Sequence, residues 1–279
     1  AKQETFLTEK DRNEDGEFDP IYGEVQELRE KNYYFKLGQH QQWLIDYIEA
    51  NPDFVAPDYR RNEVLGFLKN ETLEDLCISR PKERLEWGIP LPFDPDYVTY
   101  VWFDALTNYL SIPRSRGEEA ELWPADIHVI GKDILKFHAV YWPIMLKAAG
   151  LELPKQVLVH GWWQKDNQKM SKSTGNVIDP VTVIDDWGLD AFRYYVVREL
   201  AIGPDGNWTD EGFATRYGAE LANGLGNLMN RSLSMLKRYR EGVVPEPNDE
   251  LSSEAIAARD KLVKELKSSD LQEGLRTIW

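Results

Sequence analysis

The 279-residue sequence predicts an α/β fold followed by an all-helical region. Two β-rich runs, DIHVIG (126–131) and QVLVHG (156–161), flank a helical segment, and such strand–helix–strand units favour a parallel sheet with a right-handed crossover. From Thr209 onward the apolar residues follow helical spacing. Because 42% of the residues are hydrophobic and 12% are aromatic, the chain can bury a substantial core.

The first 97 residues form a mixed, polar segment. NYYFKL (32–37) has the composition of a strand, and QHQQWLIDYIEA (39–50) has helical spacing and is stopped by Asn51-Pro52. ISRPKERLEWGIPLPFDPD (78–96) carries too many prolines for a long regular element. We expect an ordered loop there.

Residues 98–161 carry the predicted parallel sheet. VTYVW (98–102) is another β-rich run, and KDILKFHAVYWPIMLKAAG (132–150) predicts a helix that ends in a glycine, with a kink at Pro143. Ligands of open parallel sheets bind beyond the carboxyl ends of the strands. The residues at those predicted ends are Trp102, Gly131-Lys132-Asp133 and His160-Gly161.

The last part of the chain is predicted to be helical. Asp190 to Leu200 predicts a short helix, GPDGN (203–207) a turn, and Thr209 the cap of a long helix that runs to Tyr239. The apolar stripe of the long helix consists of Phe213, Tyr217, Leu221, Leu225 and Leu228. Gly242 and the prolines at 245 and 247 end this helix, and two more helical stretches follow.

Composition and charge exclude several classes of protein. A net charge of −15 and a pI near 4.8 argue against binding of nucleic acid through bulk charge. The single Cys77 cannot form an internal disulfide and fits a reducing, cytoplasmic compartment. No run reaches the roughly 18 apolar residues of a membrane helix. The amino end lacks the pattern of a signal peptide and is unlike a natural protein start, which indicates a fragment.

The stretch KMSKSTGN (169–176) places two lysines three residues apart with hydroxyls and a glycine. One interpretation is a solvated surface turn. The other is a mobile phosphate clamp, in which Lys169 and Lys172 supply positive charge and Gly175 lets the chain flex. These residues by themselves leave both interpretations open.

A second candidate site lies on the helix after Ile130. Ile134, His138 and Trp142 are four residues apart and share one face, and Asp133 in the first turn can meet an ammonium group. Trp102, Ala105 and Tyr109 have similar spacing on the preceding segment. Taken singly, these residues are better explained by a core position or a helix start. Together they predict an aromatic cage with one carboxylate, which suits a small apolar amino acid.

One reaction covers both sites: an amino-acid carboxylate attacks the α-phosphate of ATP, and pyrophosphate leaves. The attacking carboxylate is already ionised, so this reaction needs no general base. Positioning and stabilisation of phosphate charge by lysines and Mg²⁺ are enough.

Four stretches carry a resemblance to a known family. YVWFDALTNYL, HVIGKDILKFHAVYWPIMLKAAG, KMSKSTGNVIDP and DAFRYYVVRE resemble the methionyl-tRNA synthetases, a family of class I aminoacyl-tRNA synthetases, and the similarity extends over essentially the whole chain. The resemblance implies that ATP activates methionine to methionyl-adenylate and that the methionyl group passes to tRNA(Met).

The resemblance also implies roles for individual residues. Lys172 and Lys169 would be catalytic, with Lys172 the stronger candidate for stabilising transition-state charge. The residues implied to bind methionine are Trp102, Ala105, Tyr109, Asp133, Ile134, Phe137, His138 and Trp142. Those implied to bind ATP are Arg80, Gly131, His160, Gly161, Trp163, Lys169 and Lys172. Those implied to read the anticodon are Asn223, Asn227 and Arg231, whose alternative is the polar outer face of a bundle helix.

The implied fold is the second half of a Rossmann-type nucleotide-binding domain, with part of a connective insertion before it and an α-helical bundle after it. The insertion would cover residues 1–97, the Rossmann half 98–161, the KMSKS loop and stem-contact region 162–208, and the truncated anticodon-binding bundle 209–279.

Three departures from the family pattern qualify the resemblance, and one is that the chain stops inside the implied anticodon-binding bundle. A His-Ile-Gly-His-type first signature is absent from these residues, so we expect the isolated chain to be inactive and to need the missing N-terminal half. Zinc-knuckle cysteines are also absent, and FDPIYGEV (18–25) stands in their place, which predicts no metal in this portion.

Two alternatives remain. One is a class I synthetase for Leu, Val, Ile or Cys, which the short segment between Trp102 and Gly131 disfavours. The other is a non-catalytic tRNA-binding module, which would be expected to lose Asp133 and the two lysines of the motif.

Overall fold

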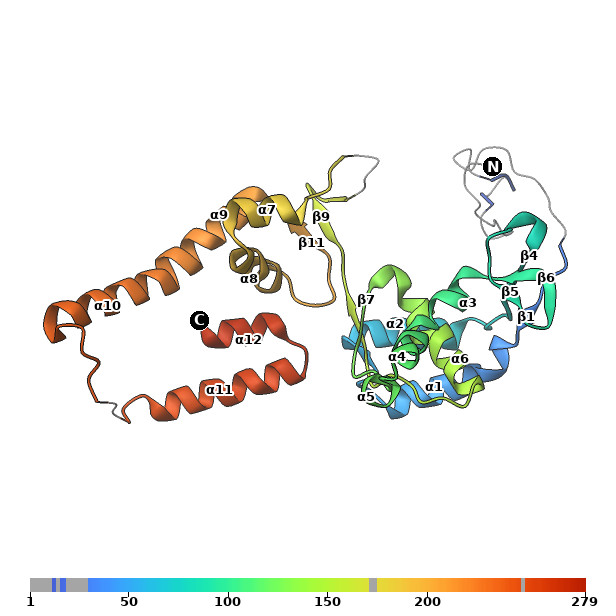
Figure 1. Ribbon diagram of the computed structural model, residues 1–279, viewed down its shortest axis with the longest axis horizontal. Helices are drawn as coiled ribbons and strands as arrows, with labels where there is room; N and C mark the ends of the chain where they lie inside the picture. The colour runs from blue at the N-terminus through green and yellow to red at the C-terminus, as the bar shows by residue number, and fades with distance from the viewer. Residues whose placement is uncertain (1–11, 14–15, 19–29, 171–174, 247–248) are drawn as a thin grey trace. The chain divides into compact units, whose positions relative to one another are not determined.

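The computed structural model describes residues 12–13, 16–18, 30–170, 175–246 and 249–279. The chain divides into two compact units, of which the first comprises residues 1–36 and 75–105 and the second comprises residues 37–74 and 106–279 (Figure 1). Residues 37–74, which the sequence-based division grouped with the start of the chain, fall in the second unit because a strand within them pairs with β8 (Val157–His160).

The first unit is built from short antiparallel strands. β1 (Tyr34–Phe35) pairs with β3 (Leu76–Cys77), which confirms the strand predicted within NYYFKL. A second sheet has the order β4-β6-β5 and consists of β4 (Ser79–Pro81), β5 (Pro90–Leu91) and β6 (Asp94–Thr99). A 3₁₀ turn, η4 (Lys82–Arg84), follows β4. The stretch expected to be a loop therefore contains short strands, and Pro81 and Pro90 stand at strand ends, where a missing backbone N–H is tolerated.

The strand predicted at 98–102 is wrong beyond Thr99. There β6 ends, the chain turns at Tyr100, and α3 (Val101–Ala105) begins. The carbonyl oxygen of Tyr100 accepts hydrogen bonds from the backbone N–H groups of Phe103 and Asp104, at 2.9 and 3.1 Å. Trp102 therefore lies on a helix. It does not stand at the carboxyl end of a parallel strand, because β6 pairs only antiparallel in its sheet.

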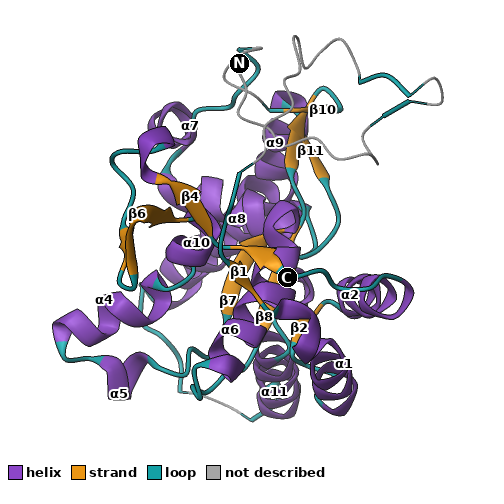
Figure 2. Ribbon diagram, turned by 90° about the vertical axis from the view of Figure 1, so that its right-hand side faces the viewer, coloured by secondary structure: helices purple, strands orange, loops and turns teal. Residues whose placement is uncertain are grey.

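The second unit contains the predicted parallel sheet. Its strands are β2 (Val55–Ala56), β7 (His128–Gly131) and β8, in the order β2-β8-β7, and all pairs are parallel. α1 (Gln41–Ala50), preceded by the 3₁₀ turn η3 (Leu37–His40), confirms the predicted helix and packs on α2 (Asp58–Asn70), which packs on β2 (Figure 2). Val55, Ile130, Val157 and Val159 are buried and form the centre of the sheet.

The crossover between β7 and β8 is helical, as predicted, but not uniformly α-helical. It consists of η5 (Lys132–Ile134), a π-helix η6 (Phe137–Tyr141) and α6 (Trp142–Ala148). Pro143 has no backbone N–H to donate, and the π-helix directly precedes it, so the irregularity falls at the expected kink. Gly150 takes a φ of +68° and ends the helix, as predicted.

A β-hairpin carries the first lysine of the KMSKS motif. β9 (Trp163–Lys165) pairs with β10 (Gln168–Lys169), and β11 (Gly206–Trp208) lies parallel to β9 on its other side. The two residues between the hairpin strands, Asp166 and Asn167, have φ values of 53° and 59°. Positive φ at both central residues is the geometry of the type I′ turn, which matches the twist of the flanking strands.

The remaining elements are helices. They are α4 (Asn108–Arg116), α5 (Glu119–Leu122), α7 (Pro180–Trp187), α8 (Leu189–Glu199), α9 (Asp210–Arg216), the π-helix η7 (Tyr217–Gly226), α10 (Asn227–Arg240), α11 (Ser252–Lys267) and α12 (Leu271–Ile278). The Thr209 hydroxyl accepts a hydrogen bond from the backbone N–H of Gly212 at 3.0 Å, which confirms the predicted cap. The predicted long helix is also confirmed, as the continuous run of α9, η7 and α10.

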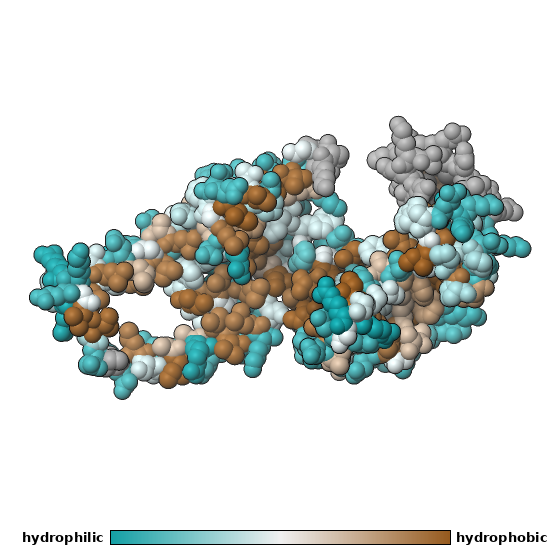
Figure 3. Space-filling model, in the orientation of Figure 1, coloured by the Kyte–Doolittle hydropathy of each residue, from teal (hydrophilic) through white to brown (hydrophobic). Residues whose placement is uncertain are grey.

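The apolar stripe of the long helix is buried at its start and exposed further along. Phe213 is 2% exposed and packs with Ala191, Tyr195 and Trp208, whereas Leu228 is 63% exposed. Figure 3 shows hydrophobic residues along both α10 and α11. Among the described residues, the helices are too short or too polar to cross a membrane.

Candidate functional site

The first group of candidate residues is a buried aromatic cluster in the second unit. Tyr109 on α4 meets both predicted partners on the crossover: its ring centroid lies 5.7 Å from that of His138 and 6.2 Å from that of Trp142. The Tyr109 hydroxyl lies 2.9 Å from Nε2 of His138. His128 on β7 adds a fourth ring at 4.2 Å from Tyr109. The structure thus brings together three residues of the predicted cage.

Both histidines of the cluster are neutral. Nδ1 of His138 lies 3.0 Å from the carbonyl oxygen of Ile134, which can only accept, so Nδ1 carries the proton and Nε2 accepts from Tyr109. Burial lowers the pKa of His138. Burial, with the charge of His138 adding to it, lowers the pKa of His128 to about 4. The cluster therefore offers polarisable rings without net charge.

Asp133 stands just beyond the end of β7, where the sequence placed it. Its Oδ1 accepts a hydrogen bond from Nε1 of Trp162 at 3.1 Å, and its side chain is exposed. This hydrogen bond lowers the pKa of the Asp133 carboxyl, and the charges of Lys169 and His160 lower it further. Asp133 is therefore an ionised, accessible carboxylate, as an ammonium-binding group must be.

The carboxyl ends of β7 and β8 lie side by side, as predicted. Gly131 and His160 are partners in the parallel ladder. A Cβ atom on Gly131 would lie 2.7 Å from Oδ1 of Asp133, and one on Gly161 would lie 2.0 Å from the carbonyl oxygen of Pro204. Gly161 is therefore required by the close approach of the 204–205 backbone, whatever binds beside it.

The two lysines of the motif differ in what the structure describes. Lys169 is exposed on β10, and its Nζ lies 3.8 Å from the ring centroid of Trp162. Lys172 lies outside the described residues. The ring of Trp163 packs with Tyr195 and Trp208, both at 6.0 Å, so its side chain anchors the hairpin.

Three predicted site residues belong to the first unit. Trp102 and Ala105 are half-buried on α3, and Arg80 lies on β4. The Arg80 guanidinium donates to the carbonyl oxygen of Ser79 at 2.7 Å and lies 4.7 Å from the ring centroid of Tyr100. The placement of these residues beside the cluster of the second unit stays a prediction.

The remaining residues of the predicted pocket and the predicted anticodon set are also placed. Phe137 lies in the π-helix, 5.4 Å from the ring of Tyr141. Asn227 and Arg231 are exposed one turn apart on α10. Asn223 is exposed within η7, whose wider turn changes the spacing on which the shared face was predicted.

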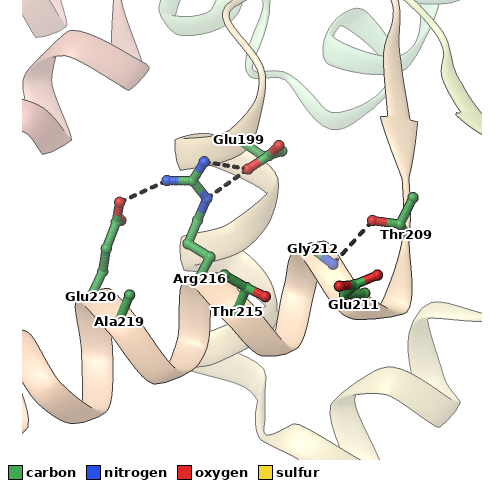
Figure 4. Close-up of a pocket in the computed structure, with 8 residues that line it drawn as sticks. All are labelled: Glu199, Thr209, Glu211, Gly212, Thr215, Arg216, Ala219 and Glu220. Atoms are coloured by element: carbon green, nitrogen blue, oxygen red, sulfur yellow. Dashed lines mark hydrogen bonds and ion pairs between the residues drawn. The ribbon is translucent and has the colours of Figure 1, made fainter.

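A pocket lies at the start of the long helix and is lined by none of the predicted site residues. Glu199, Thr209, Glu211, Gly212, Thr215, Arg216, Ala219 and Glu220 line it (Figure 4). The Arg216 guanidinium donates to Glu199 at 2.6 Å and to Glu220 at 2.7 Å. These ion pairs tie α8 to the long helix, so we assign the pocket a structural role.

Sequence reasoning assigned no role to four residues that the structure connects to the predicted ones. His128 packs on Tyr109, and Trp162 donates to Asp133. Lys132, which the sequence placed at the end of β7, pairs with Asp205, and both contact Trp162. A signal existed for His128, which alternates with the buried Ile130 along β7, and for Trp162, which directly follows His160-Gly161. Asp205 gave none, because it reaches the site from more than forty residues away in the chain.

Within the described ranges, no group of three or more His, Cys, Asp or Glu side chains is arranged to hold a metal ion. The expected absence of zinc concerns segments that are only partly described, so it stays a prediction.

Comparison with known proteins identifies the family. A family model of class I tRNA synthetases of the methionyl type, "tRNA synthetases class I (M)", matches residues 18–233. The methionine–tRNA ligase of Clostridium tetani is 44% identical over 265 residues, which cover 91% of this chain and 41% of that protein. The enzyme of Bacillus subtilis is 43% identical over 292 residues, which cover 99% of this chain and 44% of that protein.

Solved structures agree with the sequence relatives. The crystal structure of Mycobacterium tuberculosis methionyl-tRNA synthetase bound by methionyl-adenylate superposes with a TM-score of 0.81 at 42% identity, covering 90% of this chain and 50% of that one. The apo form of the same enzyme gives a TM-score of 0.78. This chain thus spans about half the length of its relatives. The Rossmann-like fold of its class I relatives is the fold of this chain, and the chain belongs to the methionyl-tRNA synthetase family.

Proposed function

We propose that this chain is the second part of a methionine–tRNA ligase, which activates methionine with ATP and transfers it to tRNA(Met). The observation that carries the proposal is the meeting of both predicted sites at Trp162. The ammonium-binding candidate Asp133 and the motif lysine Lys169 lie 3.1 and 3.8 Å from this one indole, measured to its Nε1 and to its ring centroid. Both sites are needed at one place if a carboxylate is to attack a phosphate.

The chemistry proceeds in two balanced steps. A carboxylate oxygen of methionine bonds to the α-phosphorus of ATP, the bond to the bridging oxygen breaks, and pyrophosphate leaves with that electron pair. A ribose hydroxyl of the tRNA end then attacks the carbonyl carbon and gives its proton to solvent, the bond from that carbon to the phosphate oxygen breaks, and AMP leaves with the electron pair. Because no proton must be removed from the methionine carboxylate, charge stabilisation by lysines and by the Mg²⁺ that accompanies ATP supplies the catalysis of the first step.

The methionine site is assigned to the aromatic cluster and Asp133. Tyr109, His138 and Trp142 would receive the thioether chain, since a sulfur atom interacts favourably with aromatic edges, and Asp133 would bind the ammonium group. The further members of this site are Trp102, Ala105, Ile134 and Phe137.

The ATP site is assigned to the strand ends and the motif. Gly131, His160, Gly161 and the backbone at Trp163 would approach the adenosine. Lys169, Lys172 and Arg80 would meet the phosphates, with Lys172 the main transition-state contact.

The helical part is assigned to the tRNA. α10 carries four cationic side chains (Arg231, Lys237, Arg238 and Arg240) and no acidic one, within a chain whose net charge is −15. A local basic stripe of this kind suits an RNA backbone, and Asn223, Asn227 and Arg231 would read unstacked anticodon bases. Residues 209–279 would accordingly belong to an anticodon-binding helical bundle, and 162–208 to the stem-contact region.

The remaining assignments concern the other domains and the cellular compartment. Residues 1–97 would end a connective insertion without zinc, and 98–161 would be the second Rossmann half. The enzyme would act in the cytoplasm. An N-terminal half carrying the His-Ile-Gly-His-type signature would complete the ATP site.

The test is ATP–pyrophosphate exchange with each amino acid. We expect methionine-dependent exchange from the full-length protein, none from residues 1–279 alone, and recovery when the N-terminal half is added to this chain. Exchange with leucine, valine, isoleucine or cysteine would indicate another class I synthetase. Binding of tRNA without any exchange by the full-length protein would indicate a non-catalytic RNA-binding module.

A further inference from the structure

His128 lies at the centre of the buried aromatic cluster. Its ring centroid lies 4.2 Å from that of Tyr109, 6.0 Å from that of Trp123 and 6.3 Å from that of His138. Trp123 in turn lies 5.9 Å from Trp142. The contact between His128 and Tyr109 is closer than those of Tyr109 with His138 and Trp142, at 5.7 and 6.2 Å. Tyr109 is therefore packed most closely on a residue outside the predicted methionine site.

The strand β7 presents His128 from the inner side of the cluster. His128 and Ile130 point to one face of the strand and are 4% and 2% exposed, whereas Val129 points to the other face and is 66% exposed. Tyr109 on α4 is only half-buried, so it is the more accessible of the two rings. A ligand that reaches the cluster from solvent meets Tyr109, and His128 forms the layer beneath it.

The imidazole of His128 is held by packing. Its Nε2 is buried without a hydrogen-bond partner among the described residues, and so is Nε1 of both Trp123 and Trp142. An unpaired buried polar atom costs stability, and a phenylalanine at position 128 would avoid this cost. What histidine supplies instead is a flat ring that is smaller than a phenyl ring. In a close-packed interior, the size of that ring sets how far Tyr109 can settle towards β7.

Tyr109 carries this position into the predicted methionine site. Its hydroxyl donates to Nε2 of His138, and Nδ1 of His138 donates to the carbonyl oxygen of Ile134. The hydroxyl end of Tyr109 is thus held by the crossover helix, and its ring face rests on β7. If the ring beneath were removed, Tyr109 would tilt into the space, because a core relaxes partly around a deleted side chain. The wall of the methionine site would then recede.

We propose that His128 sets the depth of the methionine pocket from beneath: its ring supports Tyr109, and the size of that ring decides how long a side chain the pocket accepts. This inference deepens the proposed function and rests on it, since it takes Tyr109 as part of the methionine site. His128 does not itself touch the substrate, so it is a positioning residue that determines specificity. Its replacement should alter the choice between substrates and not only the rate.

The experiment compares three amino acids by ATP–pyrophosphate exchange in the full-length protein. Ethionine is one methylene longer than methionine, and norleucine has the length of methionine but a methylene in place of sulfur. In His128→Ala we expect kcat/KM for ethionine relative to methionine to rise about tenfold, the scale of one methylene in an apolar pocket. The norleucine ratio should stay near that of the parent. In His128→Phe the larger ring should push Tyr109 outward and hold the ethionine ratio at or below the parental value.

The matched control is Phe54→Ala. Phe54 is also a buried ring that supports a tyrosine, Tyr47 at 5.1 Å, and it directly precedes β2 of the same sheet, but this contact lies outside the aromatic cluster. We expect parental substrate ratios from this control even though it loses stability. A raised ethionine ratio in Phe54→Ala or in His128→Phe would indicate general loosening and overturn the inference. A parental ethionine ratio in His128→Ala would also overturn it.

A second readout does not depend on activity. The chain contains four histidines, so ¹⁵N-imidazole NMR of residues 1–279 can follow Nε2 of His138, assigned by the signal lost in His138→Gln. Tyr109→Phe marks the position of this signal without the hydrogen bond. In His128→Ala the signal should move towards that position, and in Phe54→Ala it should stay parental.

The two readouts separate failure of this inference from failure of the proposed function. An unmoved His138 signal in His128→Ala would show that His128 does not support Tyr109. Absence of methionine-dependent exchange in the full-length parent would instead refute the proposed function, and the NMR spectra would still decide whether His128 supports Tyr109.

Discussion

The Tyr109 hydroxyl and His138 show how hydrogen bonds fix single residues of the aromatic cluster. The carbonyl oxygen of Ile134 fixes the His138 tautomer, the free nitrogen accepts from Tyr109, and the tyrosine ring then stands 4.2 Å from His128. Burial raises the pKa of Tyr109 and keeps its phenol protonated and able to donate. The ring faces are thereby held in place before any ligand binds, which lowers the cost of ordering them on binding.

The first prediction concerns this preorganised ring. Tyr109→Ala in the full-length protein removes a large aromatic side chain from the cluster, and such a loss costs about 3–5 kcal/mol in a packed core. We expect a raised methionine KM in pyrophosphate exchange, and the same direction for Trp102→Ala. Tyr47→Phe on α1 serves as a control that should leave the KM unchanged. A parental methionine KM in Tyr109→Ala and Trp102→Ala would contradict the pocket assignment.

The second prediction separates binding from the chemical step at the motif. Lys172→Ala should lower kcat for adenylate formation by about 10²–10³-fold, the scale for loss of one preorganised stabilising group. The methionine KM should change less, because the lysine charge is expected to meet the phosphates mainly in the transition state. Pre-steady-state adenylate formation measures this rate. An unchanged kcat with a raised methionine KM would show that Lys172 does not stabilise the transition state.

At the scale of elements, two connections place the site. The end of β8 is held against the segment before β11 at Gly161, and the type I′ turn at Asp166-Asn167 folds β10 back onto β9, which sets Lys169 beside Trp162. Both connections depend on backbone geometry at one or two residues. Small changes there should therefore have large effects on elements that lie far away in the sequence.

The third prediction tests the first connection. A Cβ at Gly161 would lie 2.0 Å from a backbone oxygen that cannot rotate away, so Gly161→Ala should destabilise residues 1–279 by at least the ~1–3 kcal/mol typical of overpacking. The matched control is Gly66→Ala on α2, where no atom lies within 4 Å of the new Cβ. There the change should stabilise by roughly 0.5–1 kcal/mol. Urea unfolding measures both. If Gly161→Ala and Gly66→Ala have equal free energies of unfolding, the end of β8 and the segment at 204–205 can move apart at little cost, and the prediction is wrong.

The fourth prediction belongs to α10. Arg231→Ala in the full-length protein should reduce charging of tRNA(Met) and leave pyrophosphate exchange intact, since specific RNA reading uses side-chain hydrogen bonds to unstacked bases. Arg240→Ala, at the end of the same helix, removes the same charge and is expected to reduce charging less. If the parent and Arg231→Ala charge tRNA(Met) at comparable rates, Arg231 does not read the anticodon and is an ordinary exposed helix residue.

At the scale of the whole molecule, an acidic chain gathers some of its cationic side chains locally. The net charge is −15, yet Lys132 and Lys169 surround one indole and α10 carries cationic side chains without acidic ones. The two buried histidines represent the opposite case, because the folded state keeps them uncharged. They make the stability of the molecule depend on pH.

The fifth prediction follows from the two histidines. In the unfolded chain each titrates near ~6.5, whereas in the folded state the pKa of His128 is about 4 and that of His138 is also lowered. Between these values the unfolded state binds protons that the folded state does not, so the free energy of unfolding falls as the pH drops from ~6.5 towards 4. His128→Phe should remove up to ~1.4 kcal/mol per pH unit of this slope. Urea unfolding of residues 1–279 at several pH values measures it. Parallel curves for parent and variant would contradict the lowered pKa.

The sequence by itself determined the elements whose signals are local. Thr209 capped the long helix, Gly150 ended the crossover, and the β-rich runs before Gly131 and His160 became neighbouring parallel strands. The family and the candidate residues followed from motifs whose spacing is also local. Composition failed at VTYVW, where a turn at Tyr100, made by the backbone, ends the strand before Trp102.

Tertiary structure decided which of these residues act together. β2 joins the sheet from a segment that composition grouped with the start of the chain, and Asp205 reaches Trp162 and Lys132 across more than forty residues. No periodic pattern in the sequence predicts either contact, because each depends on how two distant segments of the backbone approach one another. The same approach at Gly161 and Pro204 brings Asp205 to the backbone of Trp162, and the contacts of this indole with Asp133 and Lys169 became visible only in the folded chain.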